Sequence, residues 1–166
     1  MTVSQELAAE VRRHTGKASP PIQVKVDSLT ARRYARAIGD DNPIYFDEAA
    51  AKQAGYASTV VPPNFLPSYL DFTDGGPEDE LRVDGTKGDD MAWIPLEGVR
   101  LMGGGEEMIF HSPIYVDTDV VLTSYLEEVS VRESRSGLLM VMKIRNSYTT
   151  TEGAPLMDSV RTVLGR

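Results

Sequence analysis

The chain has 166 residues, of which 41% are hydrophobic and 25% are charged, a balance typical of one globular domain with a buried core. The net charge of -8 argues against a polyanionic partner such as DNA, because binding phosphates requires clustered Lys and Arg. The absence of cysteine excludes disulfides, thiolate nucleophiles and thiolate metal sites, and it fits a reducing cytoplasm.

Residues 1–13 predict a short amphipathic helix, because Leu7, Ala8 and Val11 fall on one helical face. This segment lacks the basic stretch followed by an apolar core that marks a secretory signal. No apolar run in the chain approaches the roughly 20 residues needed to cross a bilayer. We therefore expect a cytoplasmic protein.

The first half of the chain predicts a strand followed by helices with recognisable ends. Apolar and polar residues alternate in the strand, as in a half-buried sheet. A short side-chain oxygen at a helix start accepts hydrogen bonds from free backbone N–H groups, and a glycine is common just after a helix. These signals predict a strand over 22–26, a helix from Asp27 or Ser28 to Gly39, a turn over 40–46, a helix over 48–54 that Asp47 caps and Gly55 ends, and a buried central helix over 64–72.

Pro67 restricts the start of the central helix, because proline is tolerated only in a first helical turn. That turn must therefore lie close to Asn64. Residues 73–90 combine four glycines with many acidic residues and predict a long mobile loop. Loops of this length are often lids over a functional site or are disordered.

The second half of the chain predicts an antiparallel sheet. Its strand candidates are residues 96–102 with 106–110, 120–131, 138–148 and 158–164, with hairpin turns at 136–137 and 151–153. A long helix embraced by a strongly bent antiparallel sheet is the hot-dog architecture. The pattern therefore predicts an α+β fold, with a single hot-dog domain over residues 1–166.

The most informative segment is Gly39-Asp40-Asp41-Asn42-Pro43-Ile44-Tyr45. It resembles the hydratase motif G-D-x-N-P-x-H of the MaoC-like enoyl-thioester hydratases, in which the Asp and the His form the catalytic pair. Asp40 occupies the Asp position, whereas Tyr45 stands where the family has His. The similarity is strongest over residues 34–65, and the segments 103–107, 110–113 and 148–149 resemble the N-terminal-type dehydratase domains of the same superfamily.

In that family, water is added across a 2-enoyl thioester. The His is the base toward that water, the Asp holds the water and handles its other proton, and a backbone N–H at the start of the central helix polarises the thioester carbonyl. The resemblance implies no cofactor. It assigns Asp40 and Tyr45 to the catalytic positions, and Asn42, Pro63, Asn64 and Phe65 to substrate binding.

Two departures from the family pattern affect the expected chemistry. A phenol has an unperturbed pKa of about 10, so Tyr45 is protonated at neutral pH and is a poor base. Pro63 stands where the family usually has a Gly whose N–H polarises the carbonyl, and proline has no N–H. The N–H of Asn64 or Phe65 could serve only if the carbonyl were shifted by a residue. Asp40, Asn42 and Pro43 would also suit a simple turn between two helices.

The remaining polar residues give weaker signals. His111 is expected to form a structural hydrogen bond at a strand end, and His14 to be solvated. Two distant histidines without cysteine make no recognisable metal site. The glycines at 103–105 lack the Lys and helix of a phosphate-binding loop and predict a sheet bulge or a close approach. The methionines of the strand at 138–142 predict core, interface or acyl-tunnel wall.

The function that these features favour is that of one subunit of an enoyl-thioester hydratase or 3-hydroxyacyl-thioester dehydratase. Its substrate would be an acyl-CoA or acyl-ACP thioester, and a second hot-dog chain would carry the intact Asp and His. Two alternatives remain open. One is a self-sufficient homodimer that uses Asp40 with Tyr45 or another group, and the other is an acyl-thioester binding protein without catalysis.

Overall fold

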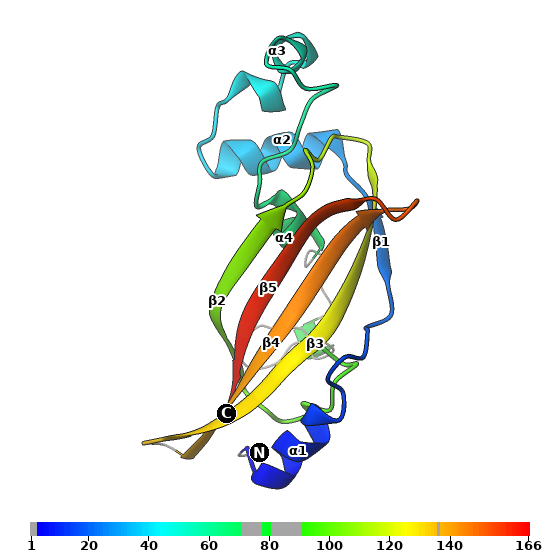
Figure 1. Cartoon of the computed structure of the whole chain (residues 1–166). Coiled ribbons are helices and arrows are strands. Elements are labelled where there is room, and N and C mark those ends of the chain that lie inside the picture. Colours follow the sequence, from blue (N-terminus) through cyan, green and yellow to red (C-terminus); the bar gives the residue numbers. More distant parts are fainter. Residues whose placement is uncertain (1–2, 71–77, 81–90, 136) are drawn as a thin grey trace.

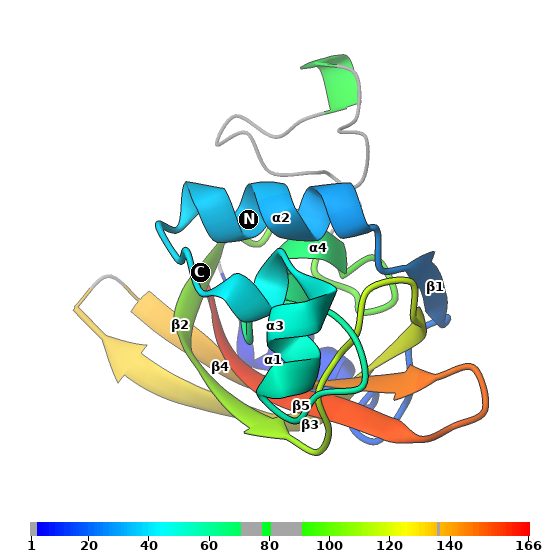
Figure 2. The ribbon, with the colours of Figure 1, turned by 90° about the horizontal axis from the view of Figure 1, so that it is seen from above.

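The computed structural model describes residues 3–70, 78–80, 91–135 and 137–166. A five-stranded antiparallel sheet with strand order β1-β3-β4-β5-β2 forms its centre. The long strands bend along their length, so that the sheet is concave toward the helices (Figures 1 and 2). The strands are β1 (Ile22–Lys25), β2 (Leu101–Phe110), β3 (Asp119–Ser134), β4 (Gly137–Thr150) and β5 (Pro155–Gly165).

The helices lie on the concave face and at both ends of the sheet. Central helix α4 lies between α2 and the sheet (Figure 2), and Phe65 of α4 meets the ring of Tyr34 in α2 edge-on, with the centroids 5.6 Å apart. Helices α2 and α3 lie beyond the sheet end where β2 finishes, and α1 lies at the opposite end (Figure 1). The helices are α1 (Gln5–Arg12), α2 (Ser28–Ala37), α3 (Glu48–Gln53) and α4 (Phe65–Leu70), with short 3-10 helices η1 (Pro43–Tyr45) and η2 (Glu78–Glu80).

The predicted helix ends are confirmed by their hydrogen bonds. The Asp27 carboxylate accepts from the backbone N–H of Thr30 at 2.6 Å and caps α2, while Asp47 accepts from Ala49 N–H at 2.7 Å and caps α3. Gly39 follows α2 with φ 73°. A left-handed residue of this kind ends a helix without the steric cost that a Cβ would bring. These two helices therefore flank the motif turn with fixed ends.

Two apolar clusters fill the space between helices and sheet. One surrounds α4, where Phe65 and Leu66 are buried. The other lies beneath α1 and contains the buried Met140 and Met142 of β4. The prediction that the methionine-rich strand contributes to the core is therefore confirmed.

A row of polar side chains crosses the sheet between the two clusters. Ser124 Oγ donates to Asn146 Oδ1 at 2.7 Å, and Asn146 Nδ2 donates to Ser159 Oγ at 3.4 Å. Asn146 and Ser159 are buried, and each finds its partner on the neighbouring strand. The hydrogen bonds remove most of the cost of burying these groups.

The predicted strand over 96–102 is wrong, because β2 begins only at Leu101. Residues before it form a turn in which the backbone N–H of Val99 donates to the carbonyl of Leu96 at 3.0 Å. Both side chains are buried in the apolar cluster beneath α1, so these residues are part of the core although they lie in a turn and not in a strand. Strand β2 then runs unbroken through the glycines, with a bulge between Gly103 and Gly105 that confirms the predicted bulge.

Except for η2, the loop predicted over 73–90 lies outside the described residues, as does the end of the predicted central helix. Within its described part, α4 begins at Phe65, which agrees with a first turn close to Asn64. None of the helices in the described ranges is long and apolar enough to span a membrane.

Candidate functional site

The motif segment folds into a compact turn between α2 and α3. The Asp40 carboxylate accepts from the backbone N–H of Asn42 at 3.1 Å, and the Asn42 side chain accepts from the N–H of Ile44 at 3.3 Å. Pro43 opens η1, where its missing N–H costs nothing. Asn42 is therefore a capping residue with an exposed side chain, and the turn delivers Tyr45 to the interior.

Tyr45 is 8% exposed and packs with Ala35 of α2 and Val60. Burial, then the negative charge of Asp40 and a hydrogen bond to that carboxylate, raises the pKa of Tyr45 above its ordinary value of 10.0. The turn thus brings the two residues of the predicted catalytic pair together. With its pKa raised, the phenol stays protonated at neutral pH, which disfavours proton abstraction by Tyr45.

A pocket of about 360 Å³ opens beside Tyr45. It lies between the motif turn, the segment that leads into α4 and the segment that follows β2. Most of its wall is apolar, as in most small-molecule sites. The pocket is lined by Ile44, Tyr45, Tyr56, Val60, Val61, Pro63, Phe110, His111, Ser112, Pro113 and Ile114.

The three residues near the start of α4 that were predicted to bind substrate differ in their surroundings. Pro63 lines the pocket. Phe65 is 1% exposed, so its side chain belongs to the core. Asn64 is exposed, and its carbonyl accepts from Tyr34 Oη at 3.2 Å and from Ser68 Oγ at 3.0 Å.

Few backbone N–H groups at the start of α4 are without a hydrogen-bond partner in the described chain. Pro63 has no N–H, and the N–H of Phe65 donates to the carbonyl of Pro62 at 3.0 Å. The N–H of Asn64 makes no hydrogen bond with any residue that the structure describes. Of the three residues at this point, Asn64 is therefore the one whose backbone N–H has no partner among the described residues.

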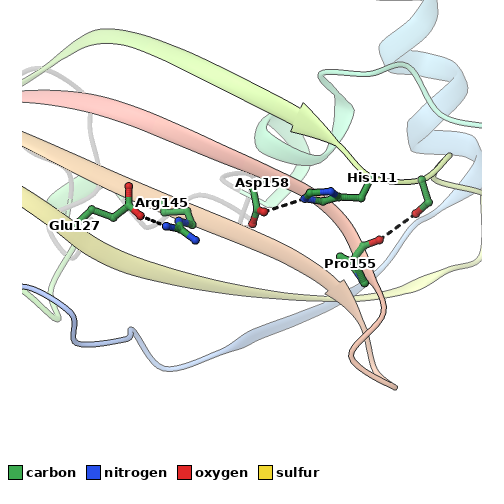
Figure 3. A network of polar contacts seen from close by, with 6 residues as sticks. His111, Glu127, Arg145, Pro155 and Asp158 are labelled. Carbon is green, nitrogen blue, oxygen red and sulfur yellow. Dashed lines mark hydrogen bonds and ion pairs between the residues drawn. The ribbon is translucent and has the colours of Figure 1, made fainter.

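His111 directly follows β2 and lines the pocket. Its Nε2 lies 2.9 Å from Asp158 Oδ2 on β5 (Figure 3), which is the kind of structural hydrogen bond expected from the sequence. Partial burial raises the pKa of Asp158, but hydrogen bonds from His111 and Ser147 outweigh this effect and hold the pKa below its ordinary value of 3.8. An ion pair of Arg145 with Glu127 continues the polar network across the strands (Figure 3).

Comparison with known proteins gives the chain its relatives. Residues 13–159 match the family model "FAS1-like, dehydratase domain region". The chain is 31% identical to the UPF0336 protein of Mycolicibacterium paratuberculosis over 165 residues, covering 99% of this chain and 84% of that protein. It is also 31% identical to a UPF0336 protein of Mycobacterium tuberculosis, with 99% and 89% covered.

Solved structures share the fold at lower identity. The ChsH1-ChsH2 complex of Mycobacterium tuberculosis matches with a TM-score of 0.75 and 20% identity over 96% of this chain and 89% of that chain. The HadBC (3R-hydroxyacyl-ACP dehydratase) complex of the same organism matches with a TM-score of 0.71 and 20% identity, covering 92% of this chain and 97% of that chain. The (R)-hydratase of A. caviae matches with a TM-score of 0.61 and 17% identity, covering 90% of this chain and 94% of that chain. The predicted α+β hot-dog fold is therefore confirmed, and the chain belongs to the FAS1-like dehydratase domain family.

Proposed function

We propose that this chain is one subunit of an enoyl-thioester hydratase or 3-hydroxyacyl-thioester dehydratase that acts in the cytoplasm on acyl-CoA or acyl-ACP. In this proposal the chain shapes the acyl tunnel, and a second hot-dog chain with an intact Asp and His performs the proton transfers. The observation that carries the proposal is the buried phenol of Tyr45, which occupies the motif position of the base.

The chemistry explains why a partner is needed. Hydration requires a group that removes a proton from water near neutral pH and a donor that stabilises the developing enolate. Tyr45 holds its proton, because both burial and the adjacent carboxylate raise its pKa. Pro63 withholds one backbone donor, so Asn64 alone would have to polarise the carbonyl. The pocket of this chain can therefore enclose an acyl group without completing the reaction.

One of the two edge strands of the sheet, β2, supports association with a second chain. Strand β2 pairs with β5 on one side, and within the described residues no strand pairs with its other side. Ile109 and Phe110 near its end are 59% and 48% exposed. Pairing of this edge with another sheet would satisfy its backbone groups. Two neighbours in fold, HadBC and ChsH1-ChsH2, are themselves complexes.

A second candidate is a self-sufficient homodimer. The proximity of Asp40 to Tyr45 favours it, because a protonated phenol beside the pocket can serve as a general acid. This candidate needs a separate base for water, and Asp40 is the carboxylate available in the motif turn. A purely binding role needs neither group.

The test compares the purified chain with the chain assembled with the hot-dog partner that co-purifies from its own organism. Hydration of crotonyl-CoA and of a longer enoyl-CoA is followed by loss of the conjugated thioester absorbance. The proposal expects turnover only in the assembly. Turnover of about 10 per second by the chain alone favours the homodimer, and tight acyl-CoA binding with an inactive assembly favours the binding role.

A further inference from the structure

A second hollow lies on the exposed side of α2, outside the pocket at Tyr45. Its volume is about 610 Å³, and Arg32, Arg33, Arg36, Ala37 and Phe46 line it. The chain as a whole carries a net charge of -8, with 25 acidic residues against 17 Lys and Arg. A hollow lined by three guanidinium groups therefore runs against the overall charge of the molecule and attracts anions locally.

The three arginines of this hollow differ in the ion pairs and ring contacts that they make within the chain. Arg36 pairs with Asp41 at 2.7 Å and lies over the ring of Phe46, 4.5 Å from its centroid. Arg32 and Arg33 form no ion pair with any carboxylate in the described part of the chain, and the charge of Arg32 acts on Asp27 only at longer range. Arg36 is thus oriented in advance, and the other two guanidinium groups keep their donors available for a ligand.

The hollow and the pocket lie on two sides of one aromatic pair. Phe46 lines the hollow, Tyr45 lines the pocket, and the two rings meet edge-on with centroids 6.5 Å apart. Helix α2 joins the same features, because its buried Ala35 packs in the cluster of Tyr45. A ligand that occupied both places would need an anionic group at one end and an acyl group at the other.

We propose that this arginine hollow binds the phosphate groups of a coenzyme A thioester, so that coenzyme A is the carrier this chain recognises. This inference rests on the proposed function. Guanidinium groups form charge-assisted, often bidentate hydrogen bonds with phosphate oxygens. In coenzyme A the pantetheine arm separates the nucleotide phosphates from the thioester, which suits an anion site set apart from the acyl pocket.

The shape of the hollow favours a nucleotide over a carrier protein. Its volume of about 610 Å³ falls in the range of small-molecule sites. A stable protein partner would need a contact surface of about 800 Å² on each side, whereas the three arginines lie within five consecutive positions of α2. The apolar surface of Ala37 and Phe46 provides a wall against which the nucleotide base can rest.

The test measures binding of coenzyme A by isothermal titration calorimetry to the full chain, in the assembly in which it purifies. The variant is Arg32→Gln/Arg33→Gln, which leaves the Arg36 contacts in place. The matched control is Arg13→Gln/Arg135→Gln, which removes the same charge from exposed positions elsewhere. Pantetheine serves as the ligand without phosphates, and circular dichroism verifies that each variant is folded.

We expect the Kd for coenzyme A to rise at least about tenfold in the Arg32/Arg33 variant, a change that corresponds to about 1.4 kcal/mol. The control variant should bind coenzyme A like the unaltered chain, and pantetheine should bind weakly and equally to both. Equal affinity of the Arg32/Arg33 variant for coenzyme A would overturn the proposal. So would the absence of coenzyme A binding, or arginine-dependent binding of an apo acyl carrier protein in its place.

Binding and turnover separate this proposal from the proposed function. If the assembly hydrates no enoyl thioester but coenzyme A binds in an arginine-dependent way, the hydratase role fails and the phosphate site stands. If the assembly is active and the Arg32/Arg33 variant keeps both its Kd for coenzyme A and its KM for crotonyl-CoA, the phosphate site fails alone.

Discussion

Restoring the missing base at position 45 should not by itself create an efficient hydratase. Tyr45→His introduces a group with an unperturbed pKa near 6.5, suited to proton abstraction at neutral pH. The N–H that the family usually has at position 63 is still missing, because Pro63 has none, and the N–H of Phe65 is engaged with Pro62. Loss of one such donor costs about 100-fold to 1000-fold in kcat, or about 2.7–4 kcal/mol, in a well-studied protease.

The assay uses crotonyl-CoA and compares Tyr45→His with Tyr45→His/Pro63→Ala, both measured on the chain alone. Alanine restores the N–H without the added flexibility of glycine, and Pro63→Gly in the same background should give a similar gain. We expect the double variant to exceed Tyr45→His by about 100-fold. Thermal unfolding is recorded for each variant, because Tyr45 is 8% exposed and a smaller side chain there leaves a cavity.

Two results would refute this reasoning. Efficient turnover by Tyr45→His alone would show that the N–H of Asn64 is a sufficient donor. A folded double variant no faster than Tyr45→His would show that position 63 is not where the carbonyl is polarised.

Three further predictions concern assembly, packing and pH. Ile109→Lys on β2 should shift the protein toward monomers in sedimentation at micromolar concentration, because this edge strand of 10 residues offers a long row of unpaired backbone groups. Ile22→Lys on β1, the opposite edge strand with 4 residues, should have little effect; the two side chains are 59% and 51% exposed. Gly104→Ala should lower the free energy of unfolding by about 1–3 kcal/mol through overpacking, because the new Cβ would lie 3.0 Å from Thr162 Cγ2. The control is Gly103→Ala, whose Cβ would meet no atom within 4 Å and which should be nearly neutral; urea titrations measure both. Partial burial raises the pKa of Asp158, but hydrogen bonds from His111 and Ser147 outweigh this effect and lower the pKa from 3.8. The stability that Asp158 contributes is therefore fully present above pH 3.8 and is lost as the pH falls through the lower pKa of the folded state. Asp158→Asn should therefore reduce stability at pH 6 more than at pH 2, and an equal loss at both would contradict the stabilisation of the ionised Asp158 by its hydrogen bonds.

Local interactions explain which elements could be predicted from the sequence. Asp27 and Asp47 cap their helices through backbone N–H groups two or three residues away, so the signal and its partner lie in one short segment. The failed strand over 96–102 shows the opposite case. Leu96 and Val99 are apolar because a turn packs them against the α1 cluster, and a period-two pattern cannot distinguish such a turn from a strand.

The candidate site divides in the same way. The motif predicted that Asp40 and Tyr45 lie together, because only four residues separate them and the turn is specified locally. The partner of His111 could not be predicted, since Asp158 is 47 positions away and reaches it only through the pairing of β2 with β5. Likewise, the polar row through Asn146 depends on the register of three strands.

The measurement that tests the central claim most directly is the effect of inactivating each subunit in the assembled enzyme. The central claim is that this chain shapes the site and its partner performs the chemistry. Asp40→Asn/Tyr45→Phe in this chain should leave kcat for crotonyl-CoA within about threefold of the unaltered assembly, a change of less than 1 kcal/mol. Replacing the Asp and His of the partner's hydratase motif should abolish turnover. If instead Asp40→Asn/Tyr45→Phe abolishes turnover in a folded assembly, this chain carries catalytic groups and the account is wrong.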